Sequence, residues 1–142
     1  MSGEPNSNDP SDAALEGLRN VARAGQLTRR PRISVGMINN MPDVALQPTE
    51  RQFLTHLEGG ADGFDLRVHN FALPGIVRSD DVRGRVKARY LDYDCLSELH
   101  MDALVITGAV PNATSLSDEP FWPHLTKLID WASTHTLSVL WY

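Results

Sequence analysis

The chain has 142 residues, of which 42% are hydrophobic and 22% are charged, a composition typical of a folded globular domain. Its formal net charge of -5 argues against a nucleic-acid-binding protein, because such proteins usually carry a basic face. The single cysteine excludes a framework of disulfide bonds within the chain. Neither an apolar run long enough to span a membrane nor the apolar core of a secretion signal occurs in the sequence. These features predict a cytoplasmic protein that binds neither membranes nor nucleic acid.

The first 31 residues are expected to form a flexible arm. They are rich in Ser, Asn, Asp, Pro and Gly, a composition typical of solvated segments. Residues 13–24 could form a short helix within this arm, because three apolar side chains recur at helical spacing: Leu15, Leu18 and Val21. We therefore divide the chain into an arm, residues 1–31, and the beginning of an α/β domain, residues 32–142.

The domain begins with a strand, a helix and a second strand. The first strand, Ile33–Ile38, is apolar almost throughout, as expected for a central parallel strand that is covered on both faces. A helix is expected to begin near Pro48, since proline fits a first helical turn, and to end at Gly59-Gly60. Asp65–Phe71 is the next strand, and this order predicts a right-handed βαβ unit.

A basic cluster follows, made of Arg78, Arg83, Arg85, Lys87 and Arg89. This cluster has two interpretations. It could bind the phosphate of a coenzyme or nucleotide, or it could be a solvated loop and helix start, which is the usual role of a charge run. Four side chains after the basic cluster also recur at helical spacing, which predicts a helix there: Tyr90, Tyr93, Leu96 and Leu99. Cys95 lies within this stretch and is interpreted as a small core residue rather than a nucleophile.

Two more apolar strands, Ala103–Thr107 and Leu137–Tyr142, enclose a helix. Ser117 is the expected N-cap of this helix, and its first turn contains the acidic residues Asp118 and Glu119. Helices thus alternate with apolar strands along the domain. This alternation predicts an α/β fold with a mainly parallel, flavodoxin-like sheet and helices on both faces.

The break after the strand Ala103–Thr107 is the expected site. Ligands bind beyond the carboxyl ends of parallel strands, and Gly108 would let the backbone approach a ligand and place an N–H group against an oxyanion. A phosphate-binding loop, a dinucleotide-binding glycine motif and a serine nucleophile elbow are all absent from the sequence. Its five histidines lack metal-ligand spacing, so no metal site is predicted.

Seven segments form a pattern through their order and spacing. The first three are ISVGMINNMP at residues 33–42, TERQFL at 49–54 and YLDYD at 90–94. The others are DALVITGA at 102–109, FWP and DWAS at 121–123 and 130–133, and LSVLWY at 137–142. Together they resemble the homoserine O-acyltransferases that start methionine synthesis, namely homoserine O-succinyltransferase and its acetyl-using relatives. The corresponding family segments read ILNLMP, TE-x-Q-hydrophobic-L, Y-x-x-F-E-D, FDGLIVTGAP, YWP with EWS, and TSTLFV.

This resemblance implies a class I glutamine-amidotransferase-like fold and a cysteine-dependent acyltransferase. Acyl-CoA would be a co-substrate rather than a bound cofactor, and the acceptor would be the hydroxyl of homoserine or a similar amino acid. The family's nucleophilic cysteine would follow Tyr142 directly. This chain alone would then be inactive and would need a complementary C-terminal polypeptide that carries Cys, His and Glu. The complete enzyme is expected to be a homodimer.

The resemblance also assigns residues to the site. It places the oxyanion hole at Gly108, Ala109 and Val110. The residues expected to contact small-molecule substrates are Asn39, Asn40, Met41, Thr49, Glu50 and Asn112. Asn112 stands where the family carries Gly or Glu, a position linked to the choice of succinyl or acetyl donor. Two alternatives remain open at this stage: a glutamine-amidotransferase-like enzyme and a non-catalytic domain that binds a partner.

Overall fold

The computed structural model describes residues 15–20 and 29–142, which belong to two units, Met1–Pro31 and Arg32–Tyr142. In the first unit residues 15–20 are helical, while the remainder of the predicted helix and most of the predicted arm lie outside the described residues. None of the helices in the described ranges is both long and apolar enough to cross a membrane.

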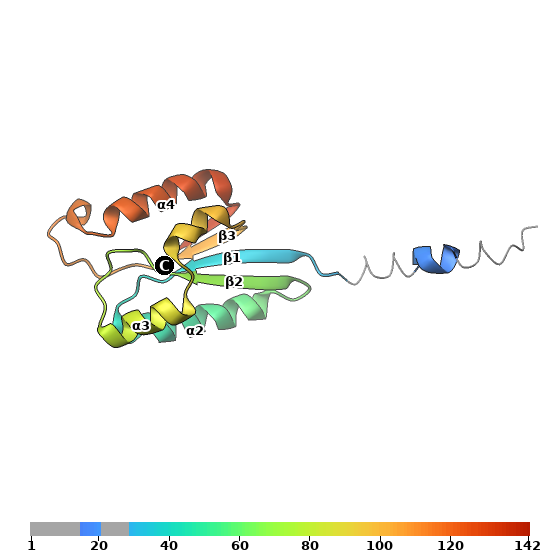
Figure 1. The fold of residues 1–142 in the computed structure, drawn as a ribbon, viewed down its shortest axis with the longest axis horizontal. Helices are drawn as coiled ribbons and strands as arrows, with labels where there is room; N and C mark the ends of the chain where they lie inside the picture. Colours follow the sequence, from blue (N-terminus) through green and yellow to red (C-terminus); the bar gives the residue numbers. More distant parts are fainter. Residues whose placement is uncertain (1–14, 21–28) are drawn as a thin grey trace, which may run out of the picture. The chain divides into compact units, whose positions relative to one another are not determined.

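The second unit is built on a four-stranded parallel sheet (Figure 1). Its strands, in the spatial order β2-β1-β3-β4, are β2 (Asp65–Phe71), β1 (Arg32–Ile38), β3 (Ala103–Ile106) and β4 (Ser138–Trp141). Each neighbouring pair is parallel, as the alternation of helices and apolar strands predicts. This order is that of the first four strands of a flavodoxin-like sheet, so the predicted α/β fold is confirmed.

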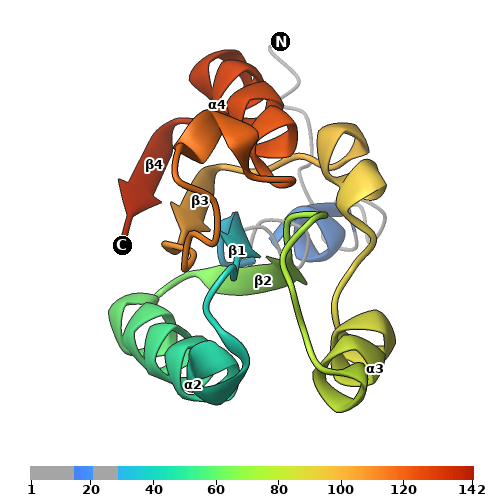
Figure 2. The same ribbon diagram turned by 90° about the vertical axis from the view of Figure 1, so that its left-hand side faces the viewer.

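Helices cover both faces of the sheet. Figure 2 shows α2 (Asp43–Gly60) and α3 (Asp80–Arg89) on one face and α4 (Trp122–His135) on the other. The core between α4 and the sheet contains buried side chains from the strands and from α4, among them Ile38, Phe71, Leu104, Ile106, Leu128 and Ala132. A Cβ atom built on Gly36 of β1 would lie 2.7 Å from Cδ2 of Leu104, so close packing against β3 explains this glycine.

Helix α2 begins at Asp43, five residues before the start predicted at Pro48, which lies inside the helix. Tertiary contacts stabilise the extra turn. The side chain of Leu46 is buried, and its carbonyl accepts a hydrogen bond from Asn39 Nδ2 at 2.9 Å. The carboxylate of Asp43 accepts a hydrogen bond from the amide of Ser79 at 2.8 Å. These contacts override the preference of proline for a first turn.

The stretch predicted as a helix from its spacing at residues 90–99 is instead a short 3₁₀ helix, η1 (Tyr93–Glu98). Asp92 begins it, since its side chain accepts a hydrogen bond from the amide of Asp94. A 3₁₀ helix of two turns directs few side chains inward, and Leu96 is the buried one. Cys95 is exposed, so its interpretation as a core residue is wrong.

The predicted start of the last helix is also wrong. Ser117 lies in a separate 3₁₀ turn, η2 (Leu116–Asp118), and α4 begins at Trp122. Glu119 precedes a proline, and a residue in that position is disfavoured in the helical region; its backbone is extended, with φ -71° and ψ 136°. The acidic side chain is therefore free to bond the preceding loop instead of the helix end.

Candidate functional site

The candidate site lies at the carboxyl ends of β1 and β3. The chain leaves β1 toward α2 on one face and leaves β3 toward α4 on the other (Figure 2). Where neighbouring parallel strands connect to opposite faces, their loops diverge and open a crevice, which is the usual ligand site of open α/β sheets. The predicted position of the site beyond Thr107 coincides with this crevice.

Asn40 ties the ends of three strands together. Its amide donates a hydrogen bond to Thr107 Oγ1 at 2.7 Å, and its Nδ2 donates to the Thr107 carbonyl at 3.2 Å. Its Oδ1 accepts from the amide of Leu73 at 3.1 Å. Both Asn40 and Thr107 are buried, with 2% and 4% of their surface exposed. The side chain expected to bind substrate is thus already used to hold the loops after β1, β2 and β3.

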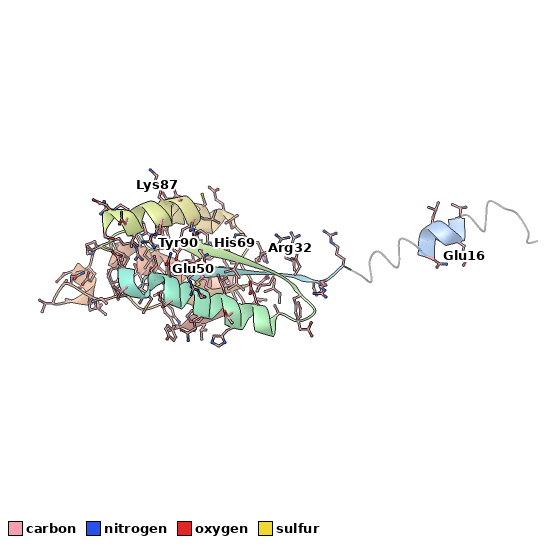
Figure 3. The ribbon with its side chains drawn as sticks, turned by 90° about the horizontal axis from the view of Figure 1, so that it is seen from below. Glu16, Arg32, Glu50, His69, Lys87 and Tyr90 are labelled. Carbon is pink, nitrogen blue, oxygen red and sulfur yellow. The ribbon has the colours of Figure 1, made fainter. Side chains whose placement is uncertain are left out.

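Asn39 faces the opposite direction, toward the space between α2 and α3. Its Nδ2 donates to the Leu46 carbonyl and, at 3.3 Å, to the Tyr90 hydroxyl, which donates to Glu50 Oε2 at 2.9 Å. Figure 3 labels Tyr90 and Glu50, which meet in this space. Burial raises the pKa of Tyr90, and the charge of Glu50 raises it further. Both side chains line a hollow of about 210 Å³, together with Arg85 of α3.

The basic cluster divides into two parts. Arg78 is buried, and its guanidinium donates to the carbonyls of Asn39 and Met41 at 3.1 and 3.0 Å. It also lies 3.5 Å from the carboxylate of Asp43, whose pKa is held below its usual value chiefly by the amide of Ser79. Arg78 therefore holds the turn after β1, which neither interpretation of the cluster anticipated. The other four basic side chains are exposed on α3, as in the solvated alternative: Arg83, Arg85, Lys87 and Arg89.

The expected oxyanion-hole residues follow β3. The amide of Gly108 donates to the carbonyl of Tyr142 at 2.7 Å, so this N–H group is occupied in the structure. For the amides of Ala109 and Val110, no hydrogen-bond acceptor is found within residues 29–142. Gly108, Ala109 and Tyr142 line a hollow of about 180 Å³ that we call the apolar hollow. Its wall is completed by aromatic and aliphatic side chains, including Leu116, Phe121, Trp122, Leu125 and Trp141.

A second hollow of about 290 Å³, which we call the polar hollow, lies beside the first. Asn40 and Phe121 line both hollows, which makes them neighbours at the same edge of the sheet. The polar hollow also contains Val110 and Asn112 from the loop after β3. The polar hollow is also lined by Asp43, Glu119 and Gly75.

Glu119 is the side chain that sequence reasoning missed. It is 3% exposed, and its Oε1 accepts hydrogen bonds from the amides of Asn112 and Ala113, the latter at 2.6 Å. The signal that could have found it is Pro120, which separates Glu119 from the helix and so leaves its side chain to the loop.

The structure distributes the predicted substrate residues between two regions. Asn40 and Asn112 meet at the polar hollow, whereas Glu50 lines the hollow between α2 and α3. Thr49 is buried within α2, and the backbone of Met41 is engaged by Arg78. In the described ranges, no group of three or more His, Cys, Asp or Glu side chains is placed to hold a metal ion.

Comparison with known proteins identifies one family. The family model for homoserine O-succinyltransferase matches residues 18–142. A homoserine O-succinyltransferase of Rhodopseudomonas palustris is 43% identical over 109 residues, covering 77% of this chain and 33% of that relative. Those of Bradyrhizobium japonicum and Cardiobacterium hominis are 41% and 37% identical, covering 77% and 87% of this chain and 34% and 35% of the relatives.

The chain therefore spans about a third of the length of the curated relatives it matches. The match includes the loop after β3, the polar and apolar hollows and the whole of β4. The sequence and the arrangement of its strands agree: the chain belongs to the homoserine O-succinyltransferase family.

Proposed function

We propose that this chain forms the amino-terminal part of an O-acyltransferase that transfers an acyl group from acyl-CoA to the hydroxyl of homoserine or a similar amino acid. The observation that carries the proposal is the hydrogen bond between the Gly108 amide and the Tyr142 carbonyl. It brings the end of β4 against the loop after β3 and the apolar hollow. A nucleophile on the residue after Tyr142 would start from this position.

The proposed nucleophile is a cysteine, and the reaction has two steps. Its thiolate attacks the acyl carbon of acyl-CoA, a new thioester forms, and the bond to the CoA sulfur breaks. The acceptor hydroxyl then gives its proton to a general base and attacks the enzyme thioester, which forms the ester and releases the thiolate. The histidine and glutamate of a complementary polypeptide would supply and orient this base.

The chain's own contribution to this chemistry would be electrostatic. In each step an oxyanion develops on the acyl carbonyl, and two amides would supply donors: that of Ala109, which lines the apolar hollow, and that of Val110, which lines the neighbouring polar hollow. One such donor is typically worth about a hundred- to a thousandfold in rate. Asn112 would face the bound substrate from the polar hollow, whose wall the hydrogen-bonded Asn40 helps to form. We also propose that the complete enzyme is cytoplasmic and homodimeric.

The test uses the protein expressed from its complete gene. Release of free CoA thiol from acetyl-CoA and succinyl-CoA is measured with and without homoserine, and intact-mass spectrometry follows the protein itself. We expect homoserine-dependent thiol release and, without acceptor, an acylated peptide that contains the residue after Tyr142. A matched variant with alanine at that next position, which removes the nucleophile, controls for thiol chemistry elsewhere, including the exposed Cys95.

Two results would overturn the proposal. If neither thioester is consumed and the protein releases ammonia from glutamine, the fold serves amide chemistry instead. If the purified protein consumes neither thioester nor glutamine while remaining folded, the chain is a binding domain. Acylation that persists in the alanine variant would show that the nucleophile lies elsewhere.

A further inference from the structure

The loop that borders both hollows is held by one buried carboxylate. Glu119 Oε1 accepts hydrogen bonds from the consecutive amides of Asn112 and Ala113. Hydrogen bonds from amides to an ionised carboxylate are stronger than those between neutral groups, and two on one oxygen fix the path of the loop. Because Val110 and Asn112 both line the polar hollow, the position of Glu119 sets the shape of this wall.

The same carboxylate has a second oxygen. Glu119 lines the polar hollow and is only 3% exposed. Within residues 15–20 and 29–142, no hydrogen-bond donor to its Oε2 is found. The other carboxylate of this hollow, Asp43, accepts from the amide of Ser79 through Oδ2, and its Oδ1 has no hydrogen bond but is closed off from solvent and lies 3.5 Å from Nη1 of Arg78. Glu119 is therefore the acidic side chain whose free oxygen remains available to whatever enters.

The described lining of the polar hollow contains carboxylates but no basic side chain. Its residues are apolar or carry amides, apart from Asp43 and Glu119. Arg78 lies 3.5 Å from Asp43 and balances its charge, so Glu119 carries the unbalanced negative charge of this lining, and a carboxylate brought into the hollow would be repelled by it. An uncharged group, or one that donates a hydrogen bond to Glu119, would meet no such penalty.

From these observations, and resting on the proposed function, we propose that Glu119 is a positioning residue with two effects on the acyltransferase site. It fixes the loop 110–113 as a wall of the polar hollow, and its charge makes that wall disfavour an acyl group with a terminal carboxylate relative to a neutral acyl group. The substrate class that this wall favours is a neutral short-chain acyl-CoA.

The test compares Glu119→Gln and Glu119→Ala in the protein expressed from its complete gene. Glutamine keeps an oxygen that can accept both amide N–H groups but removes the charge, whereas alanine removes both. Asp102→Ala is the matched control, because Asp102 also accepts an amide hydrogen bond, from Ser34 at 2.8 Å, before the start of β3 and away from both hollows. For each variant kcat and KM are measured with acetyl-CoA and with succinyl-CoA.

We expect Glu119→Gln to raise the ratio of kcat/KM for succinyl-CoA over acetyl-CoA by about three- to tenfold, as the loss of one nearby charge would. Glu119→Ala should lower kcat with both donors, and the amides of Asn112 and Ala113 should lose protection from hydrogen exchange. Asp102→Ala should leave the donor ratio and these two amides unchanged. If Glu119→Gln keeps the original kcat while Glu119→Ala lowers it, the effect comes from the lost hydrogen bonds to the loop and not from a general loss of stability.

Each half of the inference has its own contrary result. A donor ratio in Glu119→Gln within about 1.5-fold of the original would overturn selection by charge. Unchanged hydrogen exchange at Asn112 and Ala113 in Glu119→Ala would overturn the positioning role. If the unmodified protein consumes neither thioester, the proposed function fails together with selection between acyl donors, and hydrogen exchange alone decides whether Glu119 holds the loop.

Discussion

Removal of the Thr107 hydroxyl gives the sharpest test of how the crevice is held together. Thr107→Val keeps the shape of the side chain but replaces the oxygen with a methyl group. In the structure Thr107 Oγ1 accepts the hydrogen bond of the Asn40 amide at 2.7 Å and lies 3.2 Å from the Gly108 carbonyl. With valine, the buried amide of Asn40 would have no acceptor at this position.

The size of the effect follows from the burial of this pair. A buried donor left without a partner costs about 1–3 kcal/mol, and Asn40 and Thr107 are both nearly inaccessible to water. Valine recovers part of this by burying an additional methyl group, worth about 0.8 kcal/mol. We therefore expect Thr107→Val to lower the free energy of unfolding by about 1–2 kcal/mol. Urea unfolding should show this as a lower midpoint with an unchanged slope.

Thr107→Ser supplies the control, because it keeps the hydroxyl and loses only the methyl group. Its cost should be about 1 kcal/mol and should come from packing. The two variants also differ locally, since only Thr107→Val should increase hydrogen exchange at the Asn40 amide. A Thr107→Val protein as stable as the original, with the Asn40 amide still protected, would refute the assignment of this hydrogen bond.

Other parts of the site give further expected outcomes. Gly75→Ala should lower the free energy of unfolding by about 2–4 kcal/mol, because Gly75 has φ +88° and its added Cβ would lie 2.7 Å from the Pro120 carbonyl carbon; thermal unfolding measures this. Arg78→Met should cost about 2–4 kcal/mol in urea unfolding, since it leaves two carbonyl groups unpaired, and Arg78→Lys should recover only part. The hydrogen bond from Ser34 holds the pKa of Asp102 below its usual value, so its contribution to stability is present above about pH 4 and is lost as the pH falls further. Asp102→Asn should accordingly make the free energy of unfolding depend less on pH below about pH 4, which urea unfolding at several acidic pH values measures.

The strands could be predicted because their signal is local. The largely apolar runs Ile33–Ile38 and Ala103–Thr107 differ from the observed strands by one residue at an end. Their alternation with helices is also sufficient to predict a parallel sheet. The strands and their alternation with helices depend on the local sequence and on burial of both faces of the sheet. The order of apolar and polar residues along the chain reveals each of these.

The helix boundaries could not be predicted, because distant residues decide them. Asp43 joins α2 through the amide of Ser79, which lies 36 positions away. The role of Arg78 depends on the carbonyls of the turn after β1, which no spacing rule connects to a basic cluster. Glu119 is different, since the proline that follows it contained the necessary information.

In the candidate site, too, some features have a local signal in the sequence and others depend on distant residues. Sequence reasoning placed the candidate site beyond Thr107, and the structure has a hollow there, since the carboxyl ends of parallel strands meet at one edge of a sheet. It treated Gly108, Ala109 and Val110 as equivalent donors, whereas the Gly108 amide is engaged by Tyr142 in the structure. That hydrogen bond joins the ends of β3 and β4, so only the register of the two strands reveals it.

The polar side chains at this edge of the sheet have a common property that bears on catalysis. Asn39, Asn40 and Thr107 satisfy one another or nearby backbone groups, and Glu119 holds the loop that follows. Their hydrogen bonds are made before any substrate is present, so the backbone of the loop is ordered in advance. Preorganised donors cost no reorganisation when charge develops, which is the condition for strong oxyanion stabilisation. Under the proposed function, substitutions in this framework should act on kcat more than on KM, even where the altered side chain never touches the substrate.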